Sequence, residues 1–204
     1  MCLPARDAEL VQIVEAALAD AKRSAGNFLA CRVGCTQCCY GAFAINVLDA
    51  TRLRAGMADL RSTNPALASK LERRARAWLA EYGIGFPGDP ETGALGATPE
   101  DQARFETFAN DAPCPALDTG TGCCDVYAWR PMTCRVFGPP VRATRPDGAE
   151  GLGHCELCFV DATTEQVAAS EMLVPHELES ELIEELGTGL DSTSETVVAF
   201  ALIL

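Results

Sequence analysis

The sequence predicts a mainly α fold, a small helical domain in which two cysteine-rich loop regions fold together. Aromatic residues make up only 6% of the 204 residues, while apolar residues reach 48%. This mixture suits packed helices better than a sandwich or a barrel, which use more aromatic and β-branched residues. Several segments also repeat apolar residues at steps of three and four. The length is enough for one good core, so we expect a single domain over residues 1–204.

The first half of the chain contains three predicted helices. Residues 5–25 carry an apolar stripe that includes Leu10, Ile13 and Val14, which is typical of an amphipathic helix. A short extended piece at 43–47 and a helix at 48–60 follow. Asn64 and Pro65 provide a cap and a first helical residue for a helix at 65–82. The basic residues of this helix are expected to form a solvated face; they are Lys70, Arg73, Arg74 and Arg76.

The second half mixes helices with turn-rich stretches. Gly and Pro are frequent in residues 83–97, which predicts a surface loop. A capped helix is expected at 98–110 and a turn-rich connector at 138–153. Helices at 164–173 and 175–186, and a final helix or strand at 195–203, complete the helices that flank the cysteine-rich core (5–25 and 163–203).

The charge of the chain argues against polyanion binding. The formal net charge is −13 and the isoelectric point is about 4.5, so cations are too few for a dominant basic face and no nucleic-acid partner is expected. No apolar run has the length of a membrane span, so no membrane partner is expected. The N-terminal residues lack the apolar stretch of a signal peptide, and we expect a cytoplasmic location.

Eleven cysteines are the most informative feature of the composition. In a reducing compartment, clustered cysteines indicate metal ligation or thiol chemistry, and an odd number argues against a fully paired disulfide framework. Cys31, Cys35, Cys38 and Cys39 lie within nine residues, which predicts a site for a soft metal. The adjacent Cys38 and Cys39 suit two metals, two irons of one cluster, or one ligand beside a supporting thiol.

A second tract of cysteines runs from residue 114 to residue 158 and contains Cys114, Cys123, Cys124, Cys134, Cys155 and Cys158. Arg130 and Arg135 flank Cys134. A guanidinium near thiolates offsets their charge, and we prefer this role to gripping an anionic substrate. Tyr127 and Phe137 are candidates for packing beside the site or in the core.

These two tracts resemble the CxxCxxCC or YkgJ-like family, described as chelating zinc or iron. The resemblance rests on Gly34-Cys35-x2-Cys38-Cys39 and on a string from Cys114-Pro-Ala-Leu117 to Cys134-Arg135-x-Phe137, within residues 28–158. The first cysteine pair is spaced by three residues instead of two, and Cys123 and Cys158 are additional. The resemblance implies zinc or iron, in a mononuclear, dinuclear or iron–sulfur form. The ligands that it implies are Cys31, Cys35, Cys38, Cys39, Cys114, Cys124, Cys134 and Cys155.

Three functions are compatible with these residues. The first is a metal-binding protein with the metal held for structure, storage or delivery, and it needs only the cysteines. The second is an iron–sulfur enzyme that modifies a protein, because flagellin lysine methylases contain a related module; the chain shows no Gly-rich nucleotide loop, however. The third is a thiol redox switch that uses Cys38 and Cys39, or Cys155 and Cys158. Whether the chain is an enzyme, and whether it has a protein partner, stays open at this point.

Overall fold

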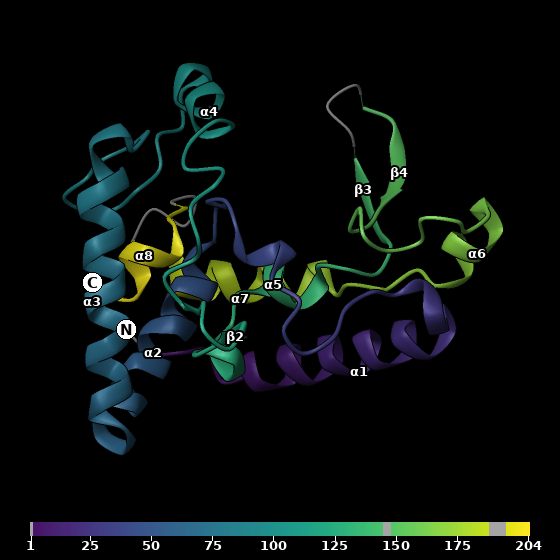
Figure 1. The fold of residues 1–204 in the computed structure, drawn as a ribbon, viewed down its shortest axis with the longest axis horizontal. Helices are drawn as coiled ribbons and strands as arrows, with labels where there is room; N and C mark the ends of the chain where they lie inside the picture. Colours follow the sequence, from purple (N-terminus) through teal and green to yellow (C-terminus); the bar gives the residue numbers. More distant parts are fainter. Residues whose placement is uncertain (1, 145–147, 188–194) are drawn as a thin grey trace. The chain divides into compact units, whose positions relative to one another are not determined.

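The computed structural model describes residues 2–144, 148–187 and 195–204, and these residues are mainly helical, as predicted (Figure 1). The α-helices in this part of the chain are α1 (Asp7–Ala25), α2 (Val47–Thr63), α3 (Pro65–Tyr82), α4 (Pro99–Phe105), α5 (Met132–Val136), α6 (Thr164–Ala169), α7 (His176–Gly187) and α8 (Val198–Ala201). Short 3-10 turns are η1 (Gly26–Phe28), η2 (Gln37–Cys39), η3 (Gly83–Gly85) and η4 (Tyr127–Trp129). Two antiparallel hairpins pair β1 (Leu117–Asp118) with β2 (Cys123–Cys124), and β3 (Val141–Thr144) with β4 (Glu150–Gly153).

The described residues divide into two compact units. Unit 1 comprises Met1–Pro4, Val33–Pro131 and Ile183–Leu204, and unit 2 comprises Ala5–Arg32 and Met132–Leu182. The single domain expected over residues 1–204 stays a prediction. The division separates the predicted ligands, since Cys31 lies in unit 2 while Cys35, Cys38 and Cys39 lie in unit 1.

The main core of unit 1 forms where α3 packs on α2 and α8 (Figure 1). The cap expected at the start of α3 is present, because the Oδ1 atom of Asn64 accepts a hydrogen bond from the amide of Leu67 at 3.2 Å. Gly56 of α2 lets the ring of Trp129 approach closely, since a Cβ at that position would lie 2.4 Å from the Trp129 Cγ atom. This contact fixes η4 against α2, immediately before Arg130.

Unit 2 is built on α1, which contacts α5 and α6. Leu10, Val14 and Leu18 of α1 are buried as the stripe predicted, whereas Ile13 is 41% exposed. Ile13 therefore lies outside the buried face, and the side chains that extend this face along the helix are Ala21 and Ala25.

Other segments also differ from the prediction. Residues 141–144 and 150–153 form the β3–β4 hairpin within the expected connector, with Val141 opposite Gly153. All of its strand residues are exposed or half-buried, so it lacks the alternation that reveals a strand in sequence. Helix α4 ends at residue 105, before a series of turns in which Ala109 has a φ of 52°. Helix α6 ends at residue 169, where the hydroxyl of Ser170 donates to the Gln166 carbonyl.

In the described part of the chain, no helix combines the length and the apolar character needed to cross a membrane.

Candidate metal centre

Part of the first cysteine tract lies directly beside the start of the second within unit 1. The amide of Cys114 donates a hydrogen bond to the carbonyl of Cys39 at 2.7 Å. Tyr40 and Pro113 form an isolated antiparallel bridge, and the amide of Gly41 donates to the Ala112 carbonyl at 2.9 Å. Backbone pairing therefore holds residues 39–41 against residues 112–114, independently of any metal.

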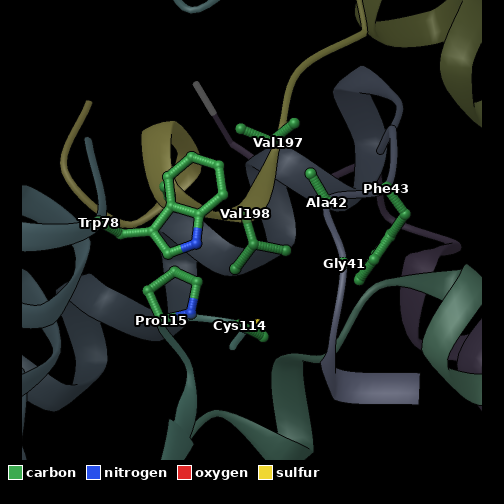
Figure 2. A pocket seen from close by; sticks show the side chains of 9 residues that line it. Gly41, Ala42, Phe43, Trp78, Cys114, Pro115, Val197 and Val198 are labelled. Carbon is green, nitrogen blue, oxygen red and sulfur yellow. The ribbon is translucent and has the colours of Figure 1, made fainter. Parts of the chain in front are cut away.

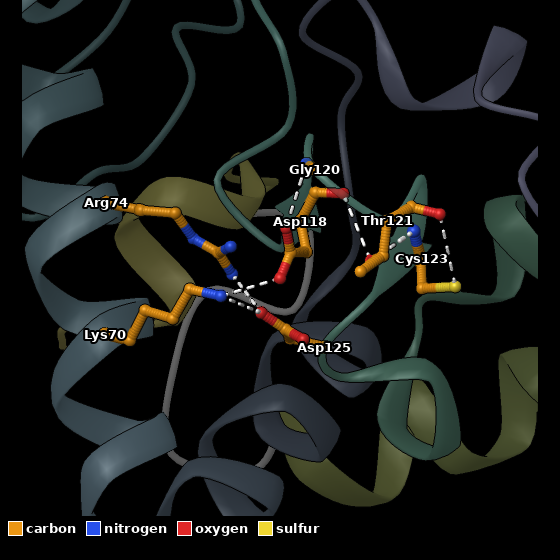
Figure 3. Close-up of polar contacts among 7 residues, drawn as sticks. All are labelled: Lys70, Arg74, Asp118, Gly120, Thr121, Cys123 and Asp125. Atoms are coloured by element: carbon orange, nitrogen blue, oxygen red, sulfur yellow. Dashed lines mark hydrogen bonds and ion pairs between the residues drawn. The ribbon is translucent and has the colours of Figure 1, made fainter.

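The β1–β2 hairpin distinguishes the adjacent Cys123 and Cys124. Leu117 pairs with Cys124 and Asp118 with Cys123. Because neighbouring residues of a strand point to opposite faces, only one of the two thiols can face the core. Cys124 packs against the unit 1 core, as Cys114 does, while Cys123 is exposed and its thiol faces the Thr121 carbonyl at 3.8 Å (Figure 3). The family resemblance named Cys124 and left Cys123 as an additional cysteine, and the hairpin register shows that Cys124 is the one that faces the core.

The thiols of Cys38, Cys39, Cys114 and Cys124 are close enough to influence each other's ionisation. A hydrogen bond from the Cys39 thiol lowers the pKa of Cys38 to about 6, with burial acting in the opposite direction and Arg130 adding to the lowering. The pKa of Cys39 is raised by the same hydrogen bond, then by burial and by the charges of Cys38, Cys114 and Cys124. These contributions place the four sulfurs in one electrostatic group.

Burial is the largest influence on the pKa values of Cys114 and Cys124, the two thiols of this group that belong to the second tract. It raises the pKa of Cys114 to about 12, although the amides of Ala116 and Leu117 oppose the shift. Burial also raises the pKa of Cys124, against the amide of Val126 and the cation of Arg130. Both thiols therefore hold their protons at neutral pH in the absence of a metal, and a bound cation would have to displace them.

Arg130 provides a buried positive charge next to this group. Only 5% of Arg130 is exposed, and its charge lowers the pKa values of both Cys38 and Cys124. The guanidinium lies 3.8 Å from the centroid of the Tyr127 ring, and its Nη1 atom donates to the Tyr127 carbonyl at 2.9 Å. Tyr127 itself is 58% exposed, so it serves as a platform for Arg130 rather than as a core anchor.

Arg135 has a different environment from Arg130. It is 2% exposed and forms an ion pair with Glu15 within unit 2. Phe137, the other aromatic residue near Cys134, is 44% exposed. The electrostatic role that we expected for the arginines is found for Arg130 at Cys38 and Cys124, whose pKa values its charge lowers.

The basic face of α3 contacts the cysteine hairpin and is not purely solvated. Lys70 forms an ion pair of 2.7 Å with Asp118, and Arg74 forms one of 2.8 Å with Asp125 (Figure 3). Lys70 also lies 3.8 Å from Asp125. The expectation of a solvated face was wrong for these two residues, because the carboxylates that attract them are about fifty positions away in sequence and become neighbours only on folding.

A small apolar pocket in unit 1 opens beside Cys114. Its wall includes Trp78, Pro115, Phe43 and Val198, and Figure 2 shows the Trp78 indole above Pro115 with Cys114 next to it. The Nε1 atom of Trp78 is buried without a hydrogen-bond partner among the described residues. A single water molecule would satisfy such a donor, and the apolar lining offers little to position a larger polar substrate.

The remaining predicted ligands divide between the units. Cys35 belongs to unit 1 and is half-buried, whereas Cys31, Cys134 and Cys155 belong to unit 2. Cys158, which the family resemblance did not include, also lies in unit 2 and is buried. The Nδ1 atom of His154 lies 3.0 Å from the Cys155 carbonyl oxygen.

The donor chemistry fits a soft metal. Thiolates are preferred ligands of zinc and of iron–sulfur clusters, and the unit 1 group supplies four from two chain segments. Within residues 2–144, 148–187 and 195–204, no three side chains of His, Cys, Asp or Glu are arranged as they would be around an ion. The backbone therefore gathers the thiols, and rotation of their side chains would have to complete a coordination sphere.

Comparison with known proteins agrees with this donor chemistry. Searches of curated proteins and of solved structures found no match. Residues 30–147, more than half of the chain, match the model of the CxxCxxCC family, which is described as "Putative zinc- or iron-chelating domain". The matched residues contain the whole unit 1 thiol group and end before Cys155. The chain belongs to the CxxCxxCC family of metal-chelating domains.

Proposed function

We propose that the protein binds zinc or iron through the thiols of Cys38, Cys39, Cys114 and Cys124. The observation that carries this proposal is the mutual electrostatic influence of these four side chains, which two distant chain segments bring together in unit 1. Cys35 lies in the same unit, two residues before η2. The backbone hydrogen bond between Cys39 and Cys114 holds the two segments that carry these thiols side by side.

Positive charge near the group supports the same function. Four thiolates around one divalent ion leave a net negative charge, which nearby cations offset. Arg130 lies close enough to stabilise the ionised forms of Cys38 and Cys124, and the charge of Arg74 lowers the pKa of Cys114 against the larger effect of burial. Neighbouring groups of this kind tune the affinity of a metal site without touching the metal.

The exposure of the site favours a metal that can enter and leave. Cys38, Cys39 and Cys124 are half-buried instead of fully enclosed, which suits storage or delivery better than a purely structural role. When bound, the metal would add a positive charge that holds the four thiols in their ionised form. Both zinc and iron accept tetrahedral thiolate ligands, so the donor set is compatible with either metal.

The alternative functions have less support. The thiol switch at Cys38 and Cys39 uses residues that the metal proposal already employs. The iron–sulfur enzyme that modifies a protein rests on the family resemblance, and it stays a prediction, as does a protein partner.

Substitution of single cysteines tests the proposal. Cys114→Ser and Cys124→Ser should each abolish stoichiometric metal at the unit 1 site, measured as metal per chain after anaerobic purification and removal of loosely bound ions. Cys123→Ser is the matched control, because it changes the neighbouring thiol, which is exposed on the opposite face of β2. Equal metal content in Cys124→Ser and Cys123→Ser would refute the assignment.

A further inference from the structure

The loop between β4 and α6 carries two cysteines of unit 2 that the proposed metal site does not use (Figure 1). They are Cys155 and Cys158, and both lie beyond residue 147, where the family match ends. We propose that these two residues form a reversible disulfide bond, which makes the loop a redox-active dithiol site. The inference involves none of the unit 1 thiols and does not depend on the proposed function.

The backbone places the two cysteines at the ends of a tight turn. The amide of Cys158 donates a hydrogen bond to the carbonyl of Cys155 at 2.9 Å, which closes a turn of four residues. The Cα atoms at the ends of such a turn lie within about 7 Å of each other. A disulfide bond joins residues whose Cα atoms are about 4.4–6.8 Å apart. The bond can therefore form with little movement of the backbone.

Both side chains point into the protein, while the turn itself lies at the surface. Cys155 is 4% exposed and Cys158 is 1% exposed, and they belong to one buried cluster together with Phe159. Between them, Glu156 and Leu157 are exposed. A small reagent therefore reaches the two thiols by local opening of a surface turn, without unfolding of the unit.

Contacts on both sides of the pair hold the turn in place. The amide of Cys155 donates to the Gly138 carbonyl at 3.2 Å, and the amide of Phe159 donates to the Phe28 carbonyl at 2.8 Å. The two phenylalanine rings stack with centroids 6.0 Å apart. Phe159 adopts a left-handed φ of 58°, a conformation that costs free energy in a non-glycine residue and that the surroundings therefore impose. The turn is thus closed before any bond joins the sulfurs.

The number of thiols in this cluster also favours disulfide chemistry. Two thiols are sufficient for a disulfide bond, whereas a structural zinc site needs four ligands. Among the described residues, the cluster around the pair includes one further cysteine, Cys31, which packs against it from the first tract. The Sγ atom of Cys31 lies against the backbone of Gly138, since a Cβ at that position would be 2.7 Å away from it. Cys31 is therefore the competing disulfide partner, and the product with Cys158 has to be distinguished from it.

A low-molecular-weight disulfide, such as oxidised glutathione, is the oxidant in this reaction. The thiolate of one cysteine attacks a sulfur atom of glutathione disulfide, which forms a mixed disulfide with the protein and releases one glutathione thiolate. The thiolate of the second cysteine then attacks the protein sulfur of the mixed disulfide, which closes the Cys155–Cys158 bond and releases the second glutathione. Both protein protons end on the released thiols, so two electrons pass from the pair to the oxidant.

The short spacing makes the bond easy to reverse. A disulfide that closes a loop of four residues constrains the unfolded chain less than one that closes a long loop. The stabilisation that would protect the bond from reduction is therefore small, and reduced glutathione should break it again by the same two exchanges in the opposite direction.

Equilibration of the full chain, as purified, with buffers of reduced and oxidised glutathione tests the inference. After acid quenching, alkylation of the remaining thiols and proteolysis, mass spectrometry reports the state of the peptide that contains both cysteines. A peptide without alkyl groups, and lighter by two hydrogen atoms, should appear as oxidised glutathione increases and disappear when reduced glutathione is restored. Cys2→Ser, which alters an exposed cysteine, is the control and should leave this titration unchanged.

Two comparisons show whether the folded turn is responsible. The equilibrium constant with glutathione should be about tenfold larger, or more, in the folded chain than in the chain denatured in urea, because the turn holds the two residues close together. Cys158→Ser should stop the reaction after the first exchange and leave one glutathione on Cys155.

Several outcomes would overturn the inference. These are full alkylation of both residues at the highest proportion of oxidised glutathione, a bond from either residue to Cys31 or to another cysteine, or equal equilibrium constants in the folded and the denatured chain. All three are observed on the wild type, so a Cys158→Ser protein that fails to fold does not affect the decision.

Discussion

The carbonyl of Cys39 accepts a hydrogen bond of 2.7 Å from the amide of Cys114, although seventy-four residues separate them along the chain. This contact joins the two cysteine tracts of unit 1 through backbone atoms. The thiols are then positioned by local structure: η2 carries Cys38 and Cys39, and the β1–β2 hairpin turns Cys124 inward. The backbone thus brings the segments that carry these thiols together before any metal binds, which would lower the entropy lost on binding.

Removal of the charge of Arg130 should weaken metal binding. In Arg130→Gln the thiolates of Cys38 and Cys124 lose a stabilising cation. We expect the affinity for the metal to fall about tenfold or more, which is usual when a group that interacts with the ligands but not with the metal is altered. Competition with a chromophoric chelator at pH 7 measures this change. Arg104→Gln is the control, because Arg104 is exposed and pairs with Asp101. Equal affinities for the two variants would contradict the role of Arg130.

Gly138→Ala should damage unit 2 more than Gly148→Ala does. Both glycines have positive φ values, so each substitution introduces backbone strain of about 1 kcal/mol. Only at Gly138 would the new Cβ also collide with the Sγ atom of Cys31, whereas nothing lies within 4 Å of a Cβ at Gly148. We therefore expect Gly138→Ala to lower the free energy of unfolding more than Gly148→Ala does, measured by urea denaturation. Equal stabilities of the two variants would argue against the contact.

Gly56→Ala separates helix propensity from packing. Alanine is favoured over glycine in a helix by about 1 kcal/mol, but its Cβ would lie 2.4 Å from the ring of Trp129. Overpacking of this kind costs about 1–3 kcal/mol, so the net result should be a lower free energy of unfolding. Gly83→Ala is the control, because its Cβ would meet Leu79 at an ordinary 3.9 Å. Urea denaturation compares the two, and a more stable Gly56→Ala protein would show that the Trp129 contact is not rigid.

The ion pair between Lys70 and Asp118 should give the β1–β2 hairpin a dependence on pH. A hydrogen bond from Lys70, followed by one from the amide of Gly120, lowers the pKa of Asp118 below its ordinary 3.8. A carboxyl with a lowered pKa in the folded state contributes stability above the pKa of the unfolded chain, and this contribution disappears as the pH falls through the folded value. The difference in stability between wild type and Asp118→Asn should thus be constant near neutrality and vanish in acid.

Titration of the Asp118 carboxyl by carbon-13 NMR of the metal-free protein provides the measurement. In the wild type the midpoint should lie below 3.8, and in Lys70→Met it should move upward. A midpoint that is the same in both proteins would show that Lys70 does not hold this carboxylate.

The helical class, the start of α3 and the family could be predicted from the sequence, because caps, apolar periodicity and cysteine spacing are local signals. It could not predict that Lys70 and Arg74 meet Asp118 and Asp125, since these contacts depend on tertiary packing. The spacing of the first four cysteines also gave no sign that Cys31 belongs to unit 2 while the next three belong to unit 1. The spacing of Cys158 likewise gave no sign that it is buried beside Cys155 and Phe159.

Metal analysis combined with an absorption spectrum of the full chain, purified without oxygen, tests the central claim most directly. Zinc or iron should be bound in a defined ratio to protein. Iron with labile sulfide would indicate a cluster, and a colourless protein with zinc would indicate mononuclear sites. A folded wild-type protein that retains neither metal, even after incubation with each, would contradict the account.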